Sequence, residues 1–378
     1  KKIKDRSNLA IMSGVALLVI GNSPATLLPF IVGTLEDGFN LNKQATGSVV
    51  STELIAMSLS AIFFGSLVNK INIRISSIIG SIAVISGYFI CAFINEIEIL
   101  RLIRAVSGVG SGLLIATGHR VLSASENPER SYAAFMFLVS ITGACFLFLA
   151  GMVAEEGGYS LLFTTFGFTF LIIFPLTLFA KTKLENDTNQ QLEKSNSSKN
   201  KLFLLIILGV IFFAIPSGGM WAFVERLGVE IGISQYEIGK VIAYALLVGV
   251  LAPVLVWFLG DRFGRKRPII ICLIIIIISL IYMLKSMNFS SYLVGNITWN
   301  FAYMITVILV LAAAARLSPD GKLASWLNAS TLLSQALAPI FFGLILTSHS
   351  FPDLLPYLMA STCLSLFCIF LTKNQLDK

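Results

Sequence analysis

The sequence has few charged residues for its length. Asp, Glu, Lys and Arg make up 12% of the 378 residues, whereas hydrophobic residues make up 56% and the mean hydropathy is +0.86. A soluble globular domain carries roughly 25% charged residues. The chain therefore lacks the polar surface that a water-soluble protein of this size needs, and we expect it to be embedded in a lipid bilayer.

Side chains that serve catalysis or metal binding are also scarce. The two histidines, His119 and His349, lie far apart in the sequence, and the five cysteines show no clustered spacing. No Walker loop, nucleophile elbow or catalytic Ser/His/Asp pattern is present. We therefore expect no metal, no cofactor and no enzymatic activity. The cysteines are interpreted as small buried hydrophobes, namely Cys91, Cys145, Cys272, Cys363 and Cys368.

Long apolar runs occupy almost all of the chain. A membrane-spanning helix requires about 20 mostly apolar residues, and twelve such runs can be placed. The first run is followed by eleven more, so we interpret it as a retained helix and not as a cleaved signal peptide. The spans are predicted at about 8–30, 45–68, 75–94, 98–120, 131–153, 158–180, 202–225, 235–259, 268–285, 290–314, 323–347 and 353–371.

Positive charge is concentrated on one side of this layout. Cytoplasmic loops of membrane proteins carry an excess of Lys and Arg, so both termini are predicted to be cytoplasmic in a multi-pass protein of the cell (inner) membrane. The same bias accounts for the formal net charge of +7, so no nucleic-acid partner is expected. The N-terminus, the loops after even-numbered helices and the C-terminus hold all 27 Lys and Arg residues except Lys43, Arg101, Arg104, Arg226, Lys240 and Lys285.

A polar segment divides the chain into two halves. Residues 181–201 are rich in Ser and Asn and show no apolar periodicity, which predicts a flexible cytoplasmic linker. It separates a six-helix bundle at 1–180 from a second one at 202–378. When the halves are aligned without a gap, Gly47 falls on Gly239 and Gly151 falls on Gly343. We therefore predict two six-helix halves related by a pseudo-two-fold repeat.

A short charged loop lies between two of the most apolar runs. It contains Asp261, Arg262, Gly264, Arg265 and Lys266. Together with the six-plus-six layout, this loop resembles the signature D-R-x-G-R-[KR] of the major facilitator superfamily. The resemblance covers the whole chain by architecture and implies an all-α integral membrane fold whose charged loop latches the two halves in one alternating-access state. The alternative is that the basic residues only anchor the topology.

The corresponding loop of the first half differs from that signature. Asn69 replaces the acid, and Arg74 aligns with the last basic residue. Because a neutral amide cannot form an ion pair, a latch would depend on Asp261. Gly264 is expected to permit a tight turn, and Asn72, in place of the loop glycine, is expected to tolerate the same conformation.

One arginine and one glutamate are predicted at membrane depth, where an ionisable residue is a functional candidate. Arg104 begins a run similar to the helix 4 pattern R-x-x-x-G-x-G-x-G of the family, and its glycines predict close helix packing. The resemblance implies that Arg104 acts in substrate binding or proton coupling; alternatively, it extends from near the outer end of its helix toward the interface. Glu53 is either the proton carrier or a structural partner of an arginine or of a neighbouring helix.

Further polar residues recur at helical spacing. Trp221 and Glu225 are four residues apart near the outer end of the seventh predicted span, so they share one helical face. They are interpreted either as a substrate gate or as residues of the interfacial belt. Polar residues line one face of the tenth and of the eleventh predicted span, and others lie next to Pro24 in the first. They are expected to face either a water-filled cavity or a neighbouring helix. These candidates are Asn22, Thr26, Asn296, Asn300, Tyr303, Asn328 and Gln335.

We expect a monomeric secondary transporter that moves a small polar or anionic organic solute by alternating access, coupled to protons. Its partners would be this solute, protons and the lipid bilayer. An efflux transporter of the same fold is an alternative, although helix 5 lacks the Gly-Pro pair of the family's antiporter pattern. A membrane sensor that binds a ligand without transporting it is another.

The charge distribution makes the topology testable. In intact cells, a membrane-impermeant maleimide should label a cysteine placed at Asp37 but not one placed at Gln190, because the two positions are predicted on opposite sides of the membrane. Labelling of position 190 from outside would contradict the layout.

Overall fold

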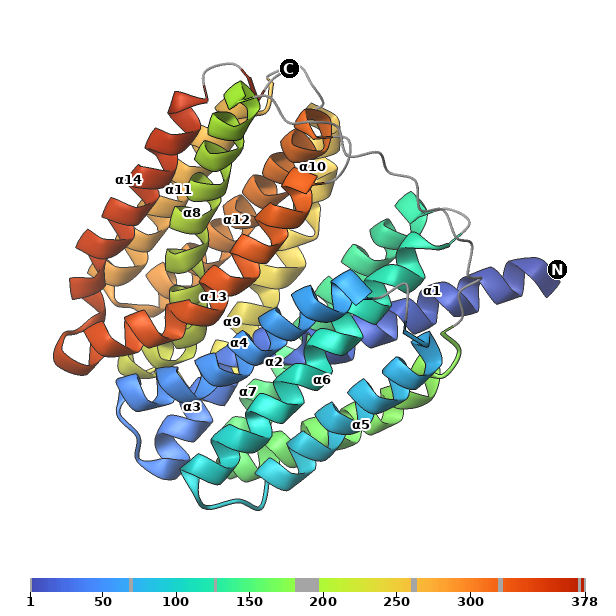
Figure 1. Cartoon of the computed structure of the whole chain (residues 1–378). Coiled ribbons are helices and arrows are strands. Elements are labelled where there is room, and N and C mark those ends of the chain that lie inside the picture. The colour runs from blue at the N-terminus through green and yellow to red at the C-terminus, as the bar shows by residue number, and fades with distance from the viewer. Residues whose placement is uncertain are drawn as a thin grey trace.

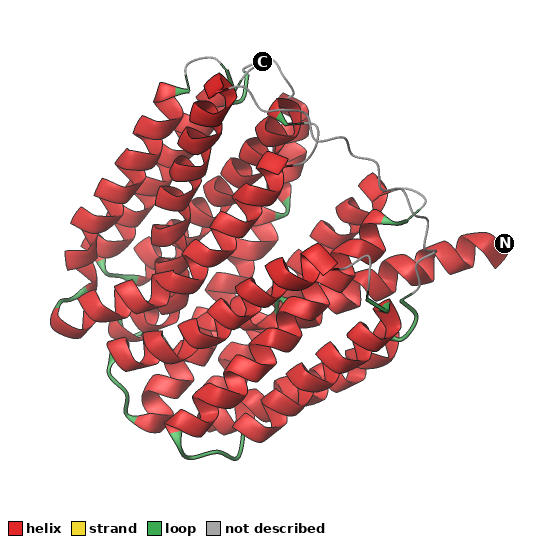
Figure 2. Cartoon of the chain, viewed as in Figure 1, coloured by secondary structure: helices red, strands yellow, loops and turns green. Residues whose placement is uncertain are grey.

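The computed structural model describes residues 2–67, 71–125, 128–180, 197–259, 264–318, 322–372 and 375–376. Every regular element in these ranges is helical, in agreement with the predicted all-α class (Figure 2). A bilayer core holds no water to bond exposed backbone groups, so a helix, which pairs its own N–H and C=O groups, is the favoured structure.

The helices form two groups that meet at one end of the molecule. Figure 1 shows them diverging toward the end that carries both termini; we call the opposite end the outer side, following the predicted topology. The first half contains α1 (Lys2–Gly21), α2 (Ser23–Thr26), α3 (Leu28–Phe39), α4 (Lys43–Leu67), α5 (Ile73–Cys91), α6 (Ile97–Ser123) and α7 (Pro128–Thr177). The second half contains α8 (Ser197–Glu230), α9 (Gln235–Gly249), α10 (Leu251–Leu259), α11 (Lys266–Ser286), α12 (Phe289–Leu317), α13 (Lys322–Ser348), the 3-10 turn η1 (Phe351–Leu354) and α14 (Leu355–Leu371).

Ten of the described helices are long and apolar enough to cross a membrane. This number is compatible with twelve spans because two segments are irregular. The helix α7 has 50 residues, and at about 1.5 Å per residue it is more than twice as long as the roughly 30 Å hydrocarbon core. It is interrupted at Gly158, whose φ of 59° and ψ of −148° are not helical. The first span is divided among α1, α2 and α3.

Two prolines account for the division of the first span. Pro24 and Pro29 have no backbone N–H, so they cannot bond the carbonyl groups of Ile20 and Ala25 one turn earlier. Short helical segments joined at Asn22 and Leu27 result.

Several expected boundaries and environments differ from the structure. The first span continues to Phe39, so Glu36 and Asp37 belong to the last turns of α3 and not to a loop. The helix α8 already begins at Ser197, inside the expected linker. Among the cysteines, Cys145 and Cys363 are exposed on the protein surface and only the other three are buried; thiols of this size can also face lipid.

The two corresponding inner loops, before α5 and before α11, form their turns with different backbone conformations. Gly264 has a φ of 65°, as expected for a tight turn. Asn72 does not adopt this left-handed conformation, because its φ is −76°. Instead, its side-chain oxygen accepts hydrogen bonds from the backbone N–H groups of Arg74 and Ile75 and caps α5.

Backbone contacts between helices of opposite halves close the outer side. A Cβ atom added at Gly151 of α7 would lie 2.6 Å from the carbonyl oxygen of Gln235 and 2.9 Å from the Cα atom of Gly239 in α9. At the crossing of α4 and α13, a Cβ atom on Gly47 or Gly343 would likewise overlap a carbonyl oxygen of the facing helix. Only glycine permits such an approach.

These four glycines are the ones that the repeat aligns. Gly47 corresponds to Gly239, and Gly151 corresponds to Gly343, so the crossing of α4 with α13 corresponds to the crossing of α9 with α7. The pseudo-two-fold repeat therefore reflects two equivalent contacts between the halves.

Replacing Gly151 by leucine should hold the outer ends of α7 and α9 apart, because overpacking a close contact costs about 1–3 kcal/mol. A cysteine at Thr34, a buried outer position, should then react about tenfold faster with an impermeant maleimide in protein that lacks Cys145 and Cys363. As a control, Gly65→Leu should leave the rate unchanged, since an added Cβ atom there has no neighbour within 4 Å. Equal rates in both variants would mean that this contact does not close the outer side.

Candidate functional site

A cavity of about 400 Å³ lies between the two halves. Both halves form its wall, and its lining comes from the broken first span and from α4, α6, α7, α8, α9, α12 and α13. The first half contributes Asn22, Ala25, Thr26, Leu28, Leu54, Met57, His119, Phe135, Met136 and Val139. The second half contributes Ser217, Gly218, Trp221, Leu246, Trp299, Asn300, Tyr303, Met304, Leu332, Gln335 and Ala336.

The wall is aromatic, polarizable and uncharged. No Lys, Arg, Asp or Glu residue occurs in its described lining. Aromatic faces favour stacking on planar rings, thioether side chains adapt their shape to a ligand, and the amides and hydroxyls supply hydrogen bonds. The cavity can therefore hold a planar organic solute with polar substituents, and apart from the imidazole of His119 its described lining offers no side chain that can carry a positive charge.

The break in the first span brings three of the predicted residues together. Asn22 and Thr26 lie in the wall, and the side-chain amide of Asn22 donates to the Leu18 carbonyl oxygen at 2.8 Å. Trp221 approaches from α8, and its indole Nε1 donates to the Ala25 carbonyl oxygen at 2.8 Å. Trp221 thus lines the cavity and is bonded to the opposite half.

The polar stripes of α12 and α13 also meet in the wall. The amide Nε2 of Gln335 donates to the Tyr303 hydroxyl at 2.7 Å, and the Tyr303 ring stacks on Phe213 with 5.0 Å between ring centroids. Asn300 lies beside them in the lining. These contacts present a phenol and two amides on one side of the cavity.

Two other predicted residues of these stripes lie outside the cavity lining. Asn296 is buried, and its amide donates to the Tyr292 carbonyl oxygen at 2.8 Å, one turn earlier in its own helix. Asn328 is exposed on the protein surface. In this conformation, neither contributes to the wall.

Glu53 and Arg104 form an ion pair inside the first half. Both side chains are buried, at 2% and 1% exposure. The guanidinium lies over the rings of Tyr88 and Phe163, at 4.7 and 5.0 Å from their centroids, an arrangement that stabilises a cation. Neither Glu53 nor Arg104 lines the cavity, so Arg104 does not face a bound solute in this conformation.

The glycines after Arg104 account for this pairing. A Cβ atom at Gly108 would overlap the Glu53 carbonyl oxygen, and one at Gly112 would overlap the Met57 carbonyl oxygen. The predicted close packing of this helix therefore occurs against α4, and at Gly110 against α5. The contact with α4 sets Glu53 within reach of Arg104.

The pair is incompletely hydrogen-bonded. The Glu53 atom Oε1 and the Ser107 hydroxyl are buried without a hydrogen-bond partner. Buried polar groups are normally satisfied. The ionic attraction between Glu53 and Arg104 therefore has to offset the cost of removing these polar groups from water.

A second buried arginine joins the halves on the outer side. Arg226 of α8 bonds both carboxylate oxygens of Asp37 in α3, at 2.7 and 3.0 Å. It also bonds Glu225 at 2.6 and 2.8 Å, and Gln235 donates to Glu225 at 3.1 Å. Glu225 is fully buried in this network and does not line the cavity.

Part of the predicted cytoplasmic latch lies outside the described residues, namely Asp261, Arg262 and Asn69. Among the described members, Arg265 is buried just before α11. The Nζ atom of Lys266 donates to the Phe370 carbonyl oxygen at 3.0 Å, which joins α11 to α14 within the second half. Arg74 is exposed.

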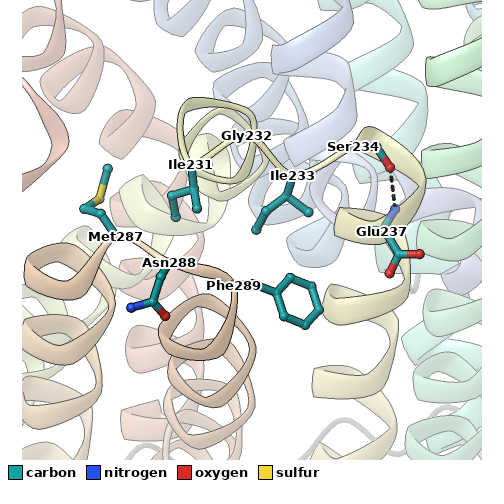
Figure 3. Close-up of a pocket in the computed structure, with 8 residues that line it drawn as sticks. All are labelled: Ile231, Gly232, Ile233, Ser234, Glu237, Met287, Asn288 and Phe289. Carbon is teal, nitrogen blue, oxygen red and sulfur yellow. Dashed lines mark hydrogen bonds between the residues drawn. The ribbon is translucent and has the colours of Figure 1, made fainter.

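A wide surface depression of about 520 Å³ lies on the outer side, where the loop between α8 and α9 meets the loop between α11 and α12 (Figure 3). Its acidic residue, Glu237, pairs with Lys240. This depression belongs to the second half alone, whereas the central cavity is formed by both halves. We therefore take the central cavity as the candidate site.

Sequence reasoning missed several residues of these two regions. Trp299 and His119 line the cavity, and Arg226 pairs with Asp37 across the halves. The position of Trp299 in the middle of a span, away from the interfacial belt, was an available signal. Within the described residues, no group of His, Cys, Asp and Glu side chains could hold a metal ion.

Known proteins resemble the chain over nearly its whole length. The Gentisate transporter of Corynebacterium glutamicum is 24% identical over 370 residues, covering 91% of this chain and 82% of that protein. The crystal structure of a mutant of the nucleoside transporter NupG is similar with a TM-score of 0.72, covering 98% of this chain and 99% of that chain at 13% identity. The family model of the Major Facilitator Superfamily matches residues 11–325 and 206–375. Because these matches cover most of the chain and the fold agrees with them, the chain belongs to the Major Facilitator Superfamily.

Proposed function

We propose that this chain moves a small polar or anionic organic solute across the membrane by alternating access, coupled to protons. The observation that carries the proposal is the cavity between the halves, whose wall is built from both of them. Closure of the outer side by glycine contacts and by the bond between Arg226 and Asp37 supports a state that excludes the outer solution. Relative rotation of the halves would break these contacts and form others at the inner side.

The wall favours a solute with a planar ring and polar substituents. Tyr303, Trp221 and Trp299 offer aromatic surface, and Asn300 and Gln335 offer amide groups. The similarity to the Gentisate transporter makes gentisate the first compound to test.

The uncharged lining supports coupling to protons. A bare carboxylate loses its hydration in a cavity whose described lining contains no Lys or Arg, and burying an unpaired charge costs several kcal/mol or more. An anionic solute would avoid this cost if a proton entered with it and neutralised its charge. Glu53 is the candidate carrier among the described residues, because it is a buried carboxylate whose partner, Arg104, sets whether it is ionised.

Efflux of amphipathic compounds is the second candidate. It is favoured by the apolar part of the wall, which contains Phe135, Met57, Met136 and Met304. The two candidates differ in the direction of net flux under a proton gradient. Counterflow, the exchange of labelled external solute for unlabelled internal solute, detects binding and exchange in either case.

The direct test is transport in proteoliposomes. Radiolabelled gentisate should exchange into vesicles preloaded with unlabelled gentisate, and an inward proton gradient should raise net uptake. Glu53→Gln should keep the exchange but lose the stimulation by the gradient, since an amide cannot carry the proton. Trp326→Phe, which changes an exposed tryptophan outside the cavity, is the control. Equal stimulation of Glu53→Gln and the control would contradict the role of Glu53, and absence of exchange in the wild type would contradict gentisate as solute.

Removal of Arg104 gives a separate prediction. Arg104→Ala should abolish uptake, because it leaves the Glu53 carboxylate buried without its partner, a loss of about 3–5 kcal/mol for a buried pair. Arg104→Lys should restore uptake poorly, since lysine lacks the planar guanidinium that stacks on Tyr88 and Phe163. Initial rates would be normalised to protein in the membrane. The double variant Arg104→Ala, Glu53→Gln removes both charges and should restore the thermal stability that the single variant loses. Wild-type uptake by Arg104→Ala would contradict the coupling role.

A further inference from the structure

A single tryptophan both lines the cavity and bonds the backbone of the opposite half. The indole Nε1 of Trp221 donates to the Ala25 carbonyl oxygen at 2.8 Å, and both residues belong to the cavity lining. Trp299 lines the same cavity, but its Nε1 has no hydrogen-bond partner. Of these two cavity tryptophans, only Trp221 connects the two halves through its indole N–H.

The break in the first span leaves this carbonyl group available. In a continuous helix, the Ala25 carbonyl would accept the N–H of the residue four positions later, but that residue is Pro29, which has none. The nearby N–H of Leu27 bonds instead to the Ser23 carbonyl oxygen. The sequence therefore creates an acceptor in the cavity wall, and the second half supplies its donor.

The segment formed by α2 and α3 is held to α8 at two levels. At the cavity, Trp221 bonds Ala25; at the outer end of α3, Arg226 bonds Asp37 through two contacts. Trp221 and Arg226 lie on the same helix, little more than one turn apart. A displacement of the indole by a ligand would therefore act directly on the segment that contributes Ala25, Thr26 and Leu28 to the cavity wall.

We propose that Trp221 is a positioning residue that couples occupancy of the cavity to closure of the outer side. Its bond to Ala25 holds the α2–α3 segment against α8 while the outer side is closed, and the bond breaks when that side opens. A solute that takes over the indole N–H compensates for the lost bond, whereas an empty cavity does not. This inference rests on the proposed transport function and assigns one residue a role in it.

Two substitutions weaken the bond in independent ways. Trp221→Phe keeps an aromatic ring but removes the donor. Pro29→Ala keeps Trp221 but adds an N–H that competes for the Ala25 carbonyl within the helix. Each has a matched control: Trp326→Phe removes an exposed indole outside the cavity, and Pro175→Ala adds an N–H at an exposed position inside α7, which does not contain the Ala25 carbonyl.

The experiment measures the distance between spin labels on the outer side in nanodiscs, with the full chain and all five native cysteines replaced. The labels are placed at Glu98 in the first half and His349 in the second, both exposed. Loss of one hydrogen bond should raise the ratio of outer-open to outer-closed populations about threefold to tenfold in Trp221→Phe and in Pro29→Ala, and the two controls should match the wild type.

Addition of gentisate as the probe tests the coupling itself. In the wild type it should shift the distance distribution toward the outer-open form, and in Trp221→Phe this shift should be reduced at least threefold. Populations of Trp221→Phe and Pro29→Ala equal to those of the wild type would overturn the inference. Gentisate flux measured on the same wild-type preparation keeps the two hypotheses apart, because absent flux contradicts the proposed solute while the unliganded distances still decide the role of Trp221.

Discussion

The outer side of the molecule depends on backbone-to-backbone contact between helices of opposite halves. Gly47 and Gly343 bring α4 against α13, and Gly151 and Gly239 bring α7 against α9. In lipid the hydrophobic effect does not drive helices together, so association relies on close van der Waals packing, which glycine permits. The distance between the halves at these crossings determines the width of the cavity and whether Trp221 and Arg226 can reach the first span.

Two of the buried arginines, Arg104 and Arg226, stabilise different parts of the structure. Arg104 and Glu53 are both in the first half, so a movement of one half against the other leaves their ion pair intact. Arg226 and Asp37 belong to different halves, so opening of the outer side separates them. Breaking a buried pair is costly unless water reaches both charges. The exposure of Asp37, whose side chain is 59% accessible, gives water access to the pair that has to break.

The cavity itself is kept free of charge. Two carboxyl groups close in the sequence to lining residues, Glu53 beside Leu54 and Glu225 four residues after Trp221, form ion pairs outside the cavity wall. An uncharged aromatic wall binds by stacking and hydrogen bonding. The solute can therefore leave without separating an ion pair, which suits a site that has to release what it binds.

The sequence alone determined the class of the protein, because hydropathy and charge bias report directly on a bilayer: the all-helical fold, the two halves, the repeat and the tight turn at Gly264 follow from local composition and spacing. It also identified Asn22, Thr26, Asn300, Tyr303 and Gln335, which line the cavity, since amides and hydroxyls within a span avoid lipid. Trp221, predicted as a gate residue or a residue of the interfacial belt, lines the cavity as well. Which polar residues face the cavity was decided only by the tertiary structure. Asn296, Glu225 and Arg104 have the same sequence signature as the wall residues, but the neighbours that bury or pair them come from distant positions, and helical periodicity does not encode which face of a helix meets which partner.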